Sequence, residues 1–229
     1  MTATVVITGA ARGIGFHLTR AFSLAGYQVI ATARRISAAK ALRDLASRGG
    51  IEVVELDVID PASLAAFAAW LGRRPIDILI NNAGVMGGEH QSLEDMDYDA
   101  WLHAFQVNTL APFRVTTALL PNLGRSSGAK VITLTSQMGS LHRKSTGRYA
   151  YRSSKAAANK VMQVMALELR DRGIIVCPIH PGWVRTDMGG PHASISVEES
   201  AKGVLSVIEA LTLEDSGRFW TWEGSEHPW

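Results

Sequence analysis

The fold of this chain is decided by the stretch Thr4-Val5-Val6-Ile7-Thr8-Gly9-Ala10-Ala11-Arg12-Gly13-Ile14-Gly15, in which an apolar run leads into a glycine-rich turn and a segment of helical period follows. A strand, a glycine turn and a helix N-terminus together form an anion site, because backbone N–H groups and the helix dipole point at a phosphate. Gly9 would allow the sharp turn, Gly13 the close approach of the backbone to a pyrophosphate, and Gly15 the close packing of the helix on the sheet. The spacing is Gly-x-x-x-Gly-x-Gly and not the commoner Gly-x-Gly-x-x-Gly, so a glycine-rich turn without a ligand stays open as the alternative.

Short apolar runs and longer segments of helical period alternate along the rest of the chain. The runs predict strands over Thr4–Thr8, Gln28–Ala33, Ile51–Glu55, Ile76–Ile80, Lys130–Thr135, Ile174–Ile179 and Arg218–Trp222. The longer segments predict helices over Gly13–Ala25, Ala38–Arg48, Ala62–Leu71, Tyr98–Leu120, Ser153–Arg172 and Val197–Leu211, with a kink or break at Pro112. Most of the runs are continuously apolar, which is typical of strands buried on both faces of a sheet. The pattern therefore predicts right-handed βαβ units and a doubly wound parallel α/β sheet of about seven strands.

Length and composition favour one globular domain over residues 1–229. Hydrophobic residues make up 47% and charged residues 19%, which excludes a disordered chain. The net charge of +2 gives no reason to expect nucleic acid or a membrane as a partner, and the N-terminal stretch has neither a basic region nor a long apolar run. Cys177 is the only cysteine and lies in an apolar run, so we expect a buried thiol, no disulfide and a cytoplasmic protein. The seven histidines show no metal-ligand spacing, so we expect no metal site.

The end of the second predicted strand tests which dinucleotide the glycine turn would suit. A site for NAD carries an acidic residue about 20 residues after the glycines, where it holds the ribose 2′-hydroxyl. Here the sequence reads Ala33-Arg34-Arg35, and Arg12 adds a third cation inside the glycine turn. Cations in place of the acid suit a 2′-phosphate, so the sequence predicts a preference for NADP(H) over NAD(H). The alternative is that Arg34 and Arg35 are solvated loop residues.

Tyr151 and Lys155 are four residues apart in a segment of helical period, so they share one face of the helix. A nearby ammonium group favours the phenolate, so we expect Lys155 to lower the pKa of Tyr151 from about 10. A tyrosine tuned in this way can give a proton to a carbonyl oxygen that is receiving hydride. Tyr149 has Ser153 and not a lysine four residues later, which excludes it from this role.

A set of short motifs occurs along the chain: Thr8-Gly9-Ala10-Ala11-Arg12-Gly13-Ile14-Gly15, Asn81-Asn82-Ala83-Gly84, Asn108, Ser136, Tyr151-x-x-x-Lys155 and Pro181-Gly182. In this order and spacing they look like the short-chain dehydrogenase/reductase family, and they span nearly the whole chain. The segment from His180 to Gly190, followed by Ser216-Gly217-Arg218-Phe219 and Pro228-Trp229, is similar to a narrower branch, the sniffer-type carbonyl reductases and C-factor-like proteins.

The resemblance implies a Rossmann-like single domain and a role for each matched residue. Ser136 would hold the substrate carbonyl or hydroxyl, and Tyr151 would be the general acid in reduction and the general base in oxidation. Lys155 would also hydrogen-bond the nicotinamide ribose, Asn108 would keep a water in the proton relay, and Asn81 would brace the sheet. The residues expected to bind the cofactor, from the resemblance or from the glycine turn and its cations, are Gly9, Arg12, Gly13, Ile14, Gly15, Arg34, Arg35, Asp57, Val58, Asn82, Ala83, Gly84, Tyr151, Lys155, Pro181, Gly182, Val184 and Thr186.

A basic stretch and two large side chains bear on the substrate. His142-Arg143-Lys144 with Arg148 and Arg152 could attract an anionic substrate, although a solvated loop is the commoner outcome for such a run. Trp183 and Met188 could wall the substrate pocket, with core packing as the alternative for Trp183.

These observations together predict an NADPH-dependent carbonyl reductase, or the matching alcohol dehydrogenase, acting on a small carbonyl or alcohol substrate. A signal or regulatory protein that binds NAD(P) without turnover stays open, because fold does not fix function. The complete set Asn108, Ser136, Tyr151 and Lys155 favours the enzyme, because a protein that only binds has no chemical need for all four. An epimerase or dehydratase acting on a nucleotide-sugar fits less well, since the C-terminal region is too short for a separate substrate domain. The resemblance also implies a homodimer or homotetramer.

Overall fold

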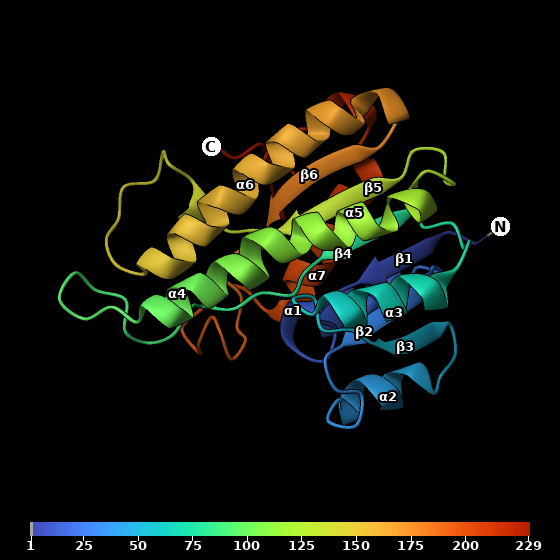
Figure 1. Cartoon of the computed structure of the whole chain (residues 1–229), viewed down its shortest axis with the longest axis horizontal. Helices are drawn as coiled ribbons and strands as arrows, with labels where there is room; N and C mark the ends of the chain where they lie inside the picture. Colours follow the sequence, from blue (N-terminus) through green and yellow to red (C-terminus); the bar gives the residue numbers. More distant parts are fainter. Residues whose placement is uncertain (1) are drawn as a thin grey trace.

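Seven parallel strands form one sheet, in the order β3-β2-β1-β4-β5-β6-β7, in a computed structural model that describes residues 2–229 (Figure 1). The strands are β1 (Thr4–Ile7), β2 (Gln28–Ala33), β3 (Ile51–Glu55), β4 (Ile78–Asn81), β5 (Lys130–Leu134), β6 (Ile175–His180) and β7 (Trp220–Thr221). All neighbouring strands pair in parallel, as the continuously apolar runs predict. The predicted doubly wound sheet is therefore confirmed.

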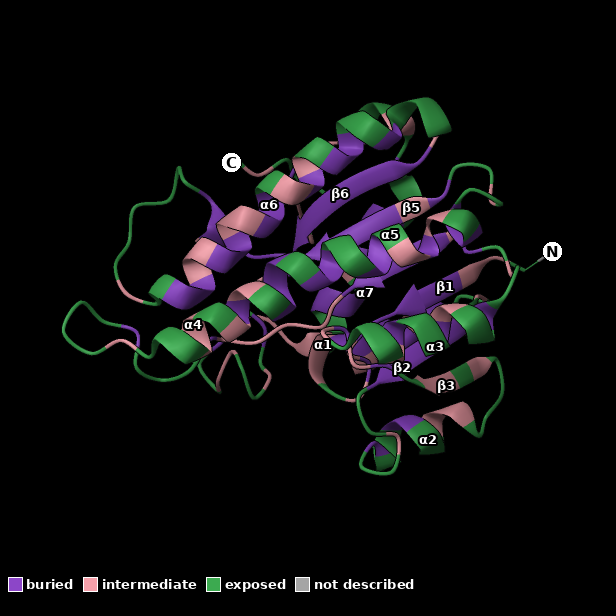
Figure 2. Ribbon diagram, in the orientation of Figure 1, coloured by how far each residue is buried: buried purple, intermediate pink, exposed green. Residues whose placement is uncertain are grey.

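Helices cover both faces of this sheet (Figure 1). They are α1 (Gly13–Leu24), α2 (Lys40–Ala46), α3 (Pro61–Leu71), α4 (Tyr98–Phe105), α5 (Ala111–Leu123), α6 (Tyr149–Leu169) and α7 (Val197–Ala210). The core shows the period-two alternation of a strand with two buried faces. Val5 and Ile7 of β1 belong to the cluster that includes α1 and α7, and Val6 belongs to the cluster that includes α3, α5 and α6. Figure 2 shows the central strands buried and the edge strand β3 only partly buried, with exposed residues on the outer faces of the helices.

The order in which strands are added to the sheet reverses between β1 and β4, while all strands stay parallel. From β1 the chain adds β2 and β3 on one side, then returns to add β4, β5, β6 and β7 on the other. The loops that follow β1 and β4 therefore diverge, and they leave a crevice at the carboxyl ends of these two strands, which is where open α/β sheets bind ligands.

Pro112 marks a break in the long helical segment, as predicted. The segment divides into α4, a π-helical turn over Gln106–Leu110, and α5, which begins at Ala111. Pro112 falls in the first turn of α5, where its missing N–H costs no hydrogen bond.

One other prediction of secondary structure needs correction. Helix α6 begins at Tyr149 and not at Ser153, because the left-handed residue Arg148 (φ +59°) turns the chain into the helix before Tyr151. The C-terminal segment packs against the loop that precedes α6, where the Ser140 hydroxyl donates to the Pro228 carbonyl at 2.7 Å.

Among residues 2–229, no helix has both the length and the apolar character needed to cross a membrane.

Candidate active site

The glycine turn after β1 packs more tightly than any side chain would allow. Gly9 has a φ of +66°, and a Cβ on it would lie 2.9 Å from the Cα of Ala83, at the end of β4. A Cβ on Gly15 would lie 2.5 Å from the Gly9 carbonyl oxygen. Gly15 therefore allows α1 to pack closely on the sheet, as predicted, and Gly9 allows the sharp turn.

Asn82 fixes this turn to the end of β4. Its Nδ2 donates to the carbonyl oxygens of Thr8 and Gly9 at 2.8 and 3.0 Å, while the Thr8 hydroxyl accepts from the backbone N–H groups of Asn82 and Ala83. Asn81 braces the neighbouring layer, since its Nδ2 reaches Thr116 Oγ1 of α5 at 3.3 Å and Thr133 Oγ1 of β5 at 3.5 Å. The two asparagines thus hold the crevice at its floor.

A cleft of about 260 Å³ runs from the glycine turn to Tyr151. Most of the predicted cofactor residues line it, namely Gly9, Arg12, Gly13, Ile14, Arg34, Asp57, Val58, Asn82, Ala83, Gly84, Tyr151, Lys155, Pro181 and Thr186. Gly15, Arg35, Gly182 and Val184 do not line it. Gly15 lies behind the turn, Arg35 is exposed outside the cleft, Val184 is buried in the interior, and a Cβ on Gly182 would collide with Ile195.

Two of the three predicted cations lie at the end of the cleft that holds the glycine turn. Arg12 and Arg34 line the cleft and Arg35 does not, and no acidic residue ends β2. Arg12 forms an ion pair with Asp187, which lies on the opposite wall of the cleft and is exposed like Arg12. The guanidinium of Arg34 has no carboxylate partner among residues 2–229, so it is free for an anionic ligand.

Tyr151, Ser136 and Lys155 meet at the other end of the cleft. Tyr151 is in the first turn of α6, and Ser136 directly follows the strand-end residues Leu134 and Thr135. The Ser136 hydroxyl lies near enough to the Tyr151 phenol to act on its pKa, and its Oγ accepts from the Met138 N–H at 3.1 Å. Lys155 lies one turn further along α6. Its Nζ donates to the Leu134 carbonyl oxygen at 2.8 Å and lies 5.8 Å from the centre of the Tyr151 ring.

The expected effect of Lys155 on Tyr151 is wrong for this structure. Burial raises the pKa of Tyr151 above its ordinary value, and the nearby Ser136 hydroxyl opposes this only in part. Burial also lowers the pKa of Lys155 to about 8. No nearby carboxylate opposes this effect on its ammonium group. Two groups buried side by side each favour their neutral forms, so Tyr151 is a protonated phenol at neutral pH.

The side chain of Asn108 ties the segment after β4 to helix α6 near Tyr151. Its Oδ1 accepts from the Val85 N–H at 2.9 Å, and its Nδ2 donates to the Val85 carbonyl at 2.9 Å and to Ser154 Oγ at 3.0 Å. The Ser154 hydroxyl in turn donates to the Tyr151 carbonyl at 2.9 Å. Both Nδ2 hydrogens of Asn108 are used, so the expected water would bind to the remaining lone pair of Oδ1 or to the main chain.

Two residues that position Tyr151 through hydrogen bonds to its main chain were not predicted from the sequence. Ser154 links Asn108 to Tyr151, and its place three residues after Tyr151 was a usable signal. Gln91 is buried in the loop before α4. Its Oε1 accepts from the Tyr151 N–H at 3.2 Å, and its Nε2 donates to the carbonyls of Met86 and Gly88. Nothing in the sequence around Gln91 indicates this role.

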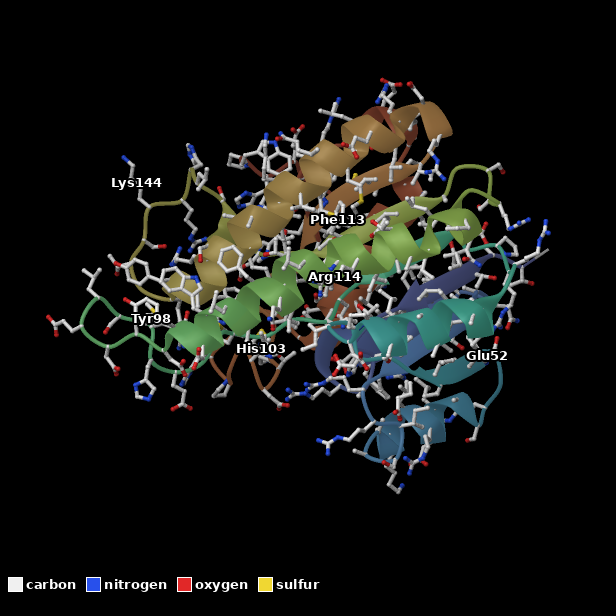
Figure 3. The ribbon with its side chains drawn as sticks, in the orientation of Figure 1. Glu52, Tyr98, His103, Phe113, Arg114 and Lys144 are labelled. Carbon is white, nitrogen blue, oxygen red and sulfur yellow. The ribbon has the colours of Figure 1, made fainter. Side chains whose placement is uncertain are left out.

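Of the two large side chains expected to line the cleft near Tyr151, Met188 does so and Trp183 does not. Met188 lines the cleft, as predicted, and so does His103 of α4 (Figure 3). Trp183 neither lines the cleft nor packs in the core, since it is half exposed and its Nε1 donates to the Gly189 carbonyl at 2.9 Å. Cys177 is a buried core thiol, as expected, and burial raises its pKa to about 12.

Comparison with known proteins bears on the class of this site. A family model described as short chain dehydrogenase matches residues 3–194. The chain is 46% identical over 167 residues to C-signal of Myxococcus xanthus, which covers 72% of this chain and 100% of that protein. It is 36% identical over 233 residues to 1-hydroxy-2-glutathionyl-2-methyl-3-butene dehydrogenase of Rhodococcus sp. (strain AD45), which covers 99% of both.

The fold and its likeness to a solved enzyme structure agree with this. The crystal structure of an NADPH-bound carbonyl reductase from chicken fatty liver superposes with a TM-score of 0.92 at 33% identity, covering 100% of this chain and 99% of that one. The family model spans both the glycine turn and the Tyr151–Lys155 pair, which are the two ends of the cleft. The chain therefore belongs to the short-chain dehydrogenase family.

Proposed function

We propose that this chain is an NADPH-dependent carbonyl reductase, or the matching alcohol dehydrogenase in the reverse direction. The observation that carries the proposal is the joining of two sites in one cleft. The tight glycine turn opens it at one end, and Tyr151, near the Ser136 hydroxyl and next to Lys155, lies at the other. The likeness to an NADPH-bound carbonyl reductase and to a dehydrogenase of full matching length supports it.

The residues of the cleft fit an NADP dinucleotide. Gly9 and Gly15 let the turn fold tightly against Ala83 and the start of α1, because a Cβ at either place would clash with neighbouring protein atoms, and the tight turn brings the backbone close to where a pyrophosphate would bind. Helix α1 begins at Gly13 and has no acidic residue in its first turn, so its free N–H groups face the cleft unopposed. Arg34 and Arg12 would hold a 2′-phosphate, and the absence of an acid at the end of β2 disfavours the 2′-hydroxyl of NAD.

The chain's own residues would manage the proton. Bound NADPH would supply the hydride that reduces the carbonyl carbon. Tyr151 would donate its phenolic proton to the carbonyl oxygen, which completes the alcohol. A pKa raised by burial suits this direction, because it keeps the acid form of Tyr151 populated at neutral pH. Ser136 would orient the same oxygen through its hydroxyl, and Lys155 would return a proton toward the phenol after each turnover.

A second candidate function is a nucleotide-binding signal protein with little or no turnover. The 46% identity to C-signal favours it, although that match leaves more than a quarter of this chain without a counterpart. The complete set of Asn108, Ser136, Tyr151 and Lys155 favours the enzyme, because all four are buried at one end of the cleft. Ser154 connects Asn108 to the Tyr151 main chain, and Lys155 Nζ lies 5.8 Å from the centre of the Tyr151 ring.

We also propose a homodimer or homotetramer that works in the cytoplasm. The apolar side chains of Leu102 on α4, Phe113 on α5 (labelled in Figure 3) and Leu167 on α6 are exposed, and exposed apolar side chains support association. Light scattering coupled to gel filtration would give the mass of the species in solution.

The test of the proposed activity is NADPH consumption by the purified protein with a panel of small aldehydes and ketones. We expect turnover of at least one carbonyl, a loss of about 10²–10⁴-fold in Tyr151→Phe, and near wild-type rates in the matched control Tyr149→Phe. Tight NADPH binding with no turnover of any carbonyl would overturn the proposal in favour of the signal protein.

A further inference from the structure

The wall of the site that carries Tyr151 is unusually poor in acidic residues. No Asp or Glu occurs between Asp99 and Glu168, whereas this segment holds nine Lys and Arg residues in a chain of net charge +2. The loop between Ser136 and Tyr151 contains His142, Arg143, Lys144 and Arg148 of this segment. These cations therefore have no acidic neighbour in sequence, and their partners must come from elsewhere.

Arg143 is the member of this loop that turns back toward the catalytic residues. Its Nη1 donates to Oε1 of Gln137, the residue directly after Ser136. Burial, then the charge of His227, then the charge of Arg143 lower the pKa of His180 at the end of β6 to about 3. Arg143 therefore lies near the end of β5, through Gln137, and its charge acts on His180 at the end of β6, the neighbouring strand.

The guanidinium of Arg143 has only a neutral partner. Within residues 2–229 it forms no ion pair, whereas Arg12, Arg74 and Arg170 each pair with a carboxylate. The Gln137 amide offers the guanidinium a single acceptor oxygen. A carboxylate in its place would offer two oxygens and could accept two parallel hydrogen bonds. Arg143 is also exposed, so a ligand can reach it.

The acidic residues of the loop before α4, which includes Asp95 and Asp97, do not form ion pairs with these cations within residues 2–229. Asp95 contacts His90 Nδ1 at 2.5 Å, and Asp97 accepts from the Ala100 N–H at 2.9 Å at the start of α4. No ion pair joins this loop to the basic loop in the part of the chain that the structure describes. The positive charge beside Ser136 is thus left for a ligand.

We propose that Arg143 recognises the substrate, and that the preferred substrates are aldehydes or ketones that carry a carboxylate. This inference rests on the proposed reductase function and adds the substrate class to it. The carbonyl group would bind at Tyr151 and Ser136 while the carboxylate replaces Gln137 Oε1 on the guanidinium. Arginine suits this role because its planar fork matches a carboxylate in a bidentate pair.

The test compares substrates that differ only in the charge. The 2-, 3- and 4-carboxybenzaldehydes are each measured against the corresponding methyl formylbenzoate at low ionic strength. We expect kcat/KM of the wild type to favour at least one carboxylate over its ester by about tenfold, mainly through KM. Arg143→Gln should abolish that ratio, so that each carboxylate and its ester have about the same kcat/KM.

Lys144→Gln is the matched control, because Lys144 has the same charge but points away from the helices (Figure 3) and makes no hydrogen bond or ion pair within residues 2–229. It should keep the carboxylate preference. The inference is overturned if the wild type favours none of the three carboxylates, or if Arg143→Gln keeps the preference.

A binding measurement separates this inference from the proposed function. Calorimetric titration of the NADPH-saturated protein with each carboxybenzyl alcohol and with its methyl ester needs no turnover, because the reduced cofactor and the alcohol cannot react with each other. Tighter binding of the acid by wild type and Lys144→Gln, but not by Arg143→Gln, supports the inference even if no aldehyde is reduced. Equal binding of acid and ester by the wild type overturns the inference even if the ester aldehydes are turned over, which would leave the reductase function standing.

Discussion

Replacing Lys155 with methionine should make the cofactor-free protein more stable at neutral pH while it destroys the activity. Lys155 is 5% exposed, and burial lowers its pKa from 10.5 to about 8. Because the unfolded chain binds this proton more tightly than the folded one, holding the charged form in the interior costs about 3 kcal/mol below pH 8. Methionine has a similar length and no charge, so it removes that cost.

The expected net gain is smaller than the full cost of burial. Methionine also loses the hydrogen bond from Nζ to the Leu134 carbonyl, which is worth about 1 kcal/mol and leaves that oxygen unpaired. At pH 7 the variant should therefore be about 2 kcal/mol more stable than the wild type. The penalty fades as pH rises from the folded pKa toward 10.5, so the advantage should fall by about 2 kcal/mol between pH 7 and about pH 9.5.

Urea unfolding of both proteins at the two pH values measures this difference directly. Lys160→Met serves as the control, because Lys160 lies on the same helix but is exposed, and its effect should be small at both pH values. A Lys155→Met protein that is less stable than the wild type at pH 7, or a difference that does not change with pH, would refute the reasoning from burial.

Three further predictions concern the glycine turn, the cations and the core. Gly15→Ala should abolish NADPH binding and cost about 1–3 kcal/mol in urea unfolding, because the new Cβ would lie 2.5 Å from the Gly9 carbonyl oxygen. Arg34→Ala should weaken NADPH binding by about 1.5–3 kcal/mol in a fluorescence titration and leave NADH binding unchanged, whereas Arg35→Ala, outside the cleft, should change neither; an equal loss in both variants would contradict this. Cys177, with its pKa raised to about 12, should resist a thiol reagent at pH 8 until the protein is unfolded, and rapid labelling of the native protein would show an exposed thiol instead.

Much of the fold could be predicted because the strands are short, apolar and bounded by turns. The bounds of β2 and β3 match the predicted runs. In β2 every residue after Gln28 is buried, as a parallel sheet covered on both faces demands, whereas β3 lies at the sheet edge and is only partly buried. Strand β4 begins two residues later than predicted. The Ile76 N–H donates to the Asn122 carbonyl in the last turn of α5, so Ile76 belongs to the connection and not to the ladder.

The chemistry of the site was less accessible than its residues. Spacing places Tyr151 and Lys155 on one helix face, but it carries no information on how deeply both are buried, and burial decides the direction of both pKa shifts. The Arg12–Asp187 ion pair joins residues 175 positions apart, and Gln91 reaches Tyr151 from 60 positions away. Such contacts depend on how loops fold back over the sheet, which local sequence patterns do not encode.

The central claim is that hydride passes to a substrate carbonyl while Tyr151 supplies the proton. The most direct test is a single-turnover reaction of the purified protein with NADPH deuterated at both C4 positions and an aldehyde, followed by mass spectrometry of the alcohol. The account predicts one deuterium on the carbinol carbon with the wild type, and the same product formed about 10²–10⁴-fold more slowly with Tyr151→Phe. An alcohol without the label, or a Tyr151→Phe protein that forms labelled product at the wild-type rate, would contradict it.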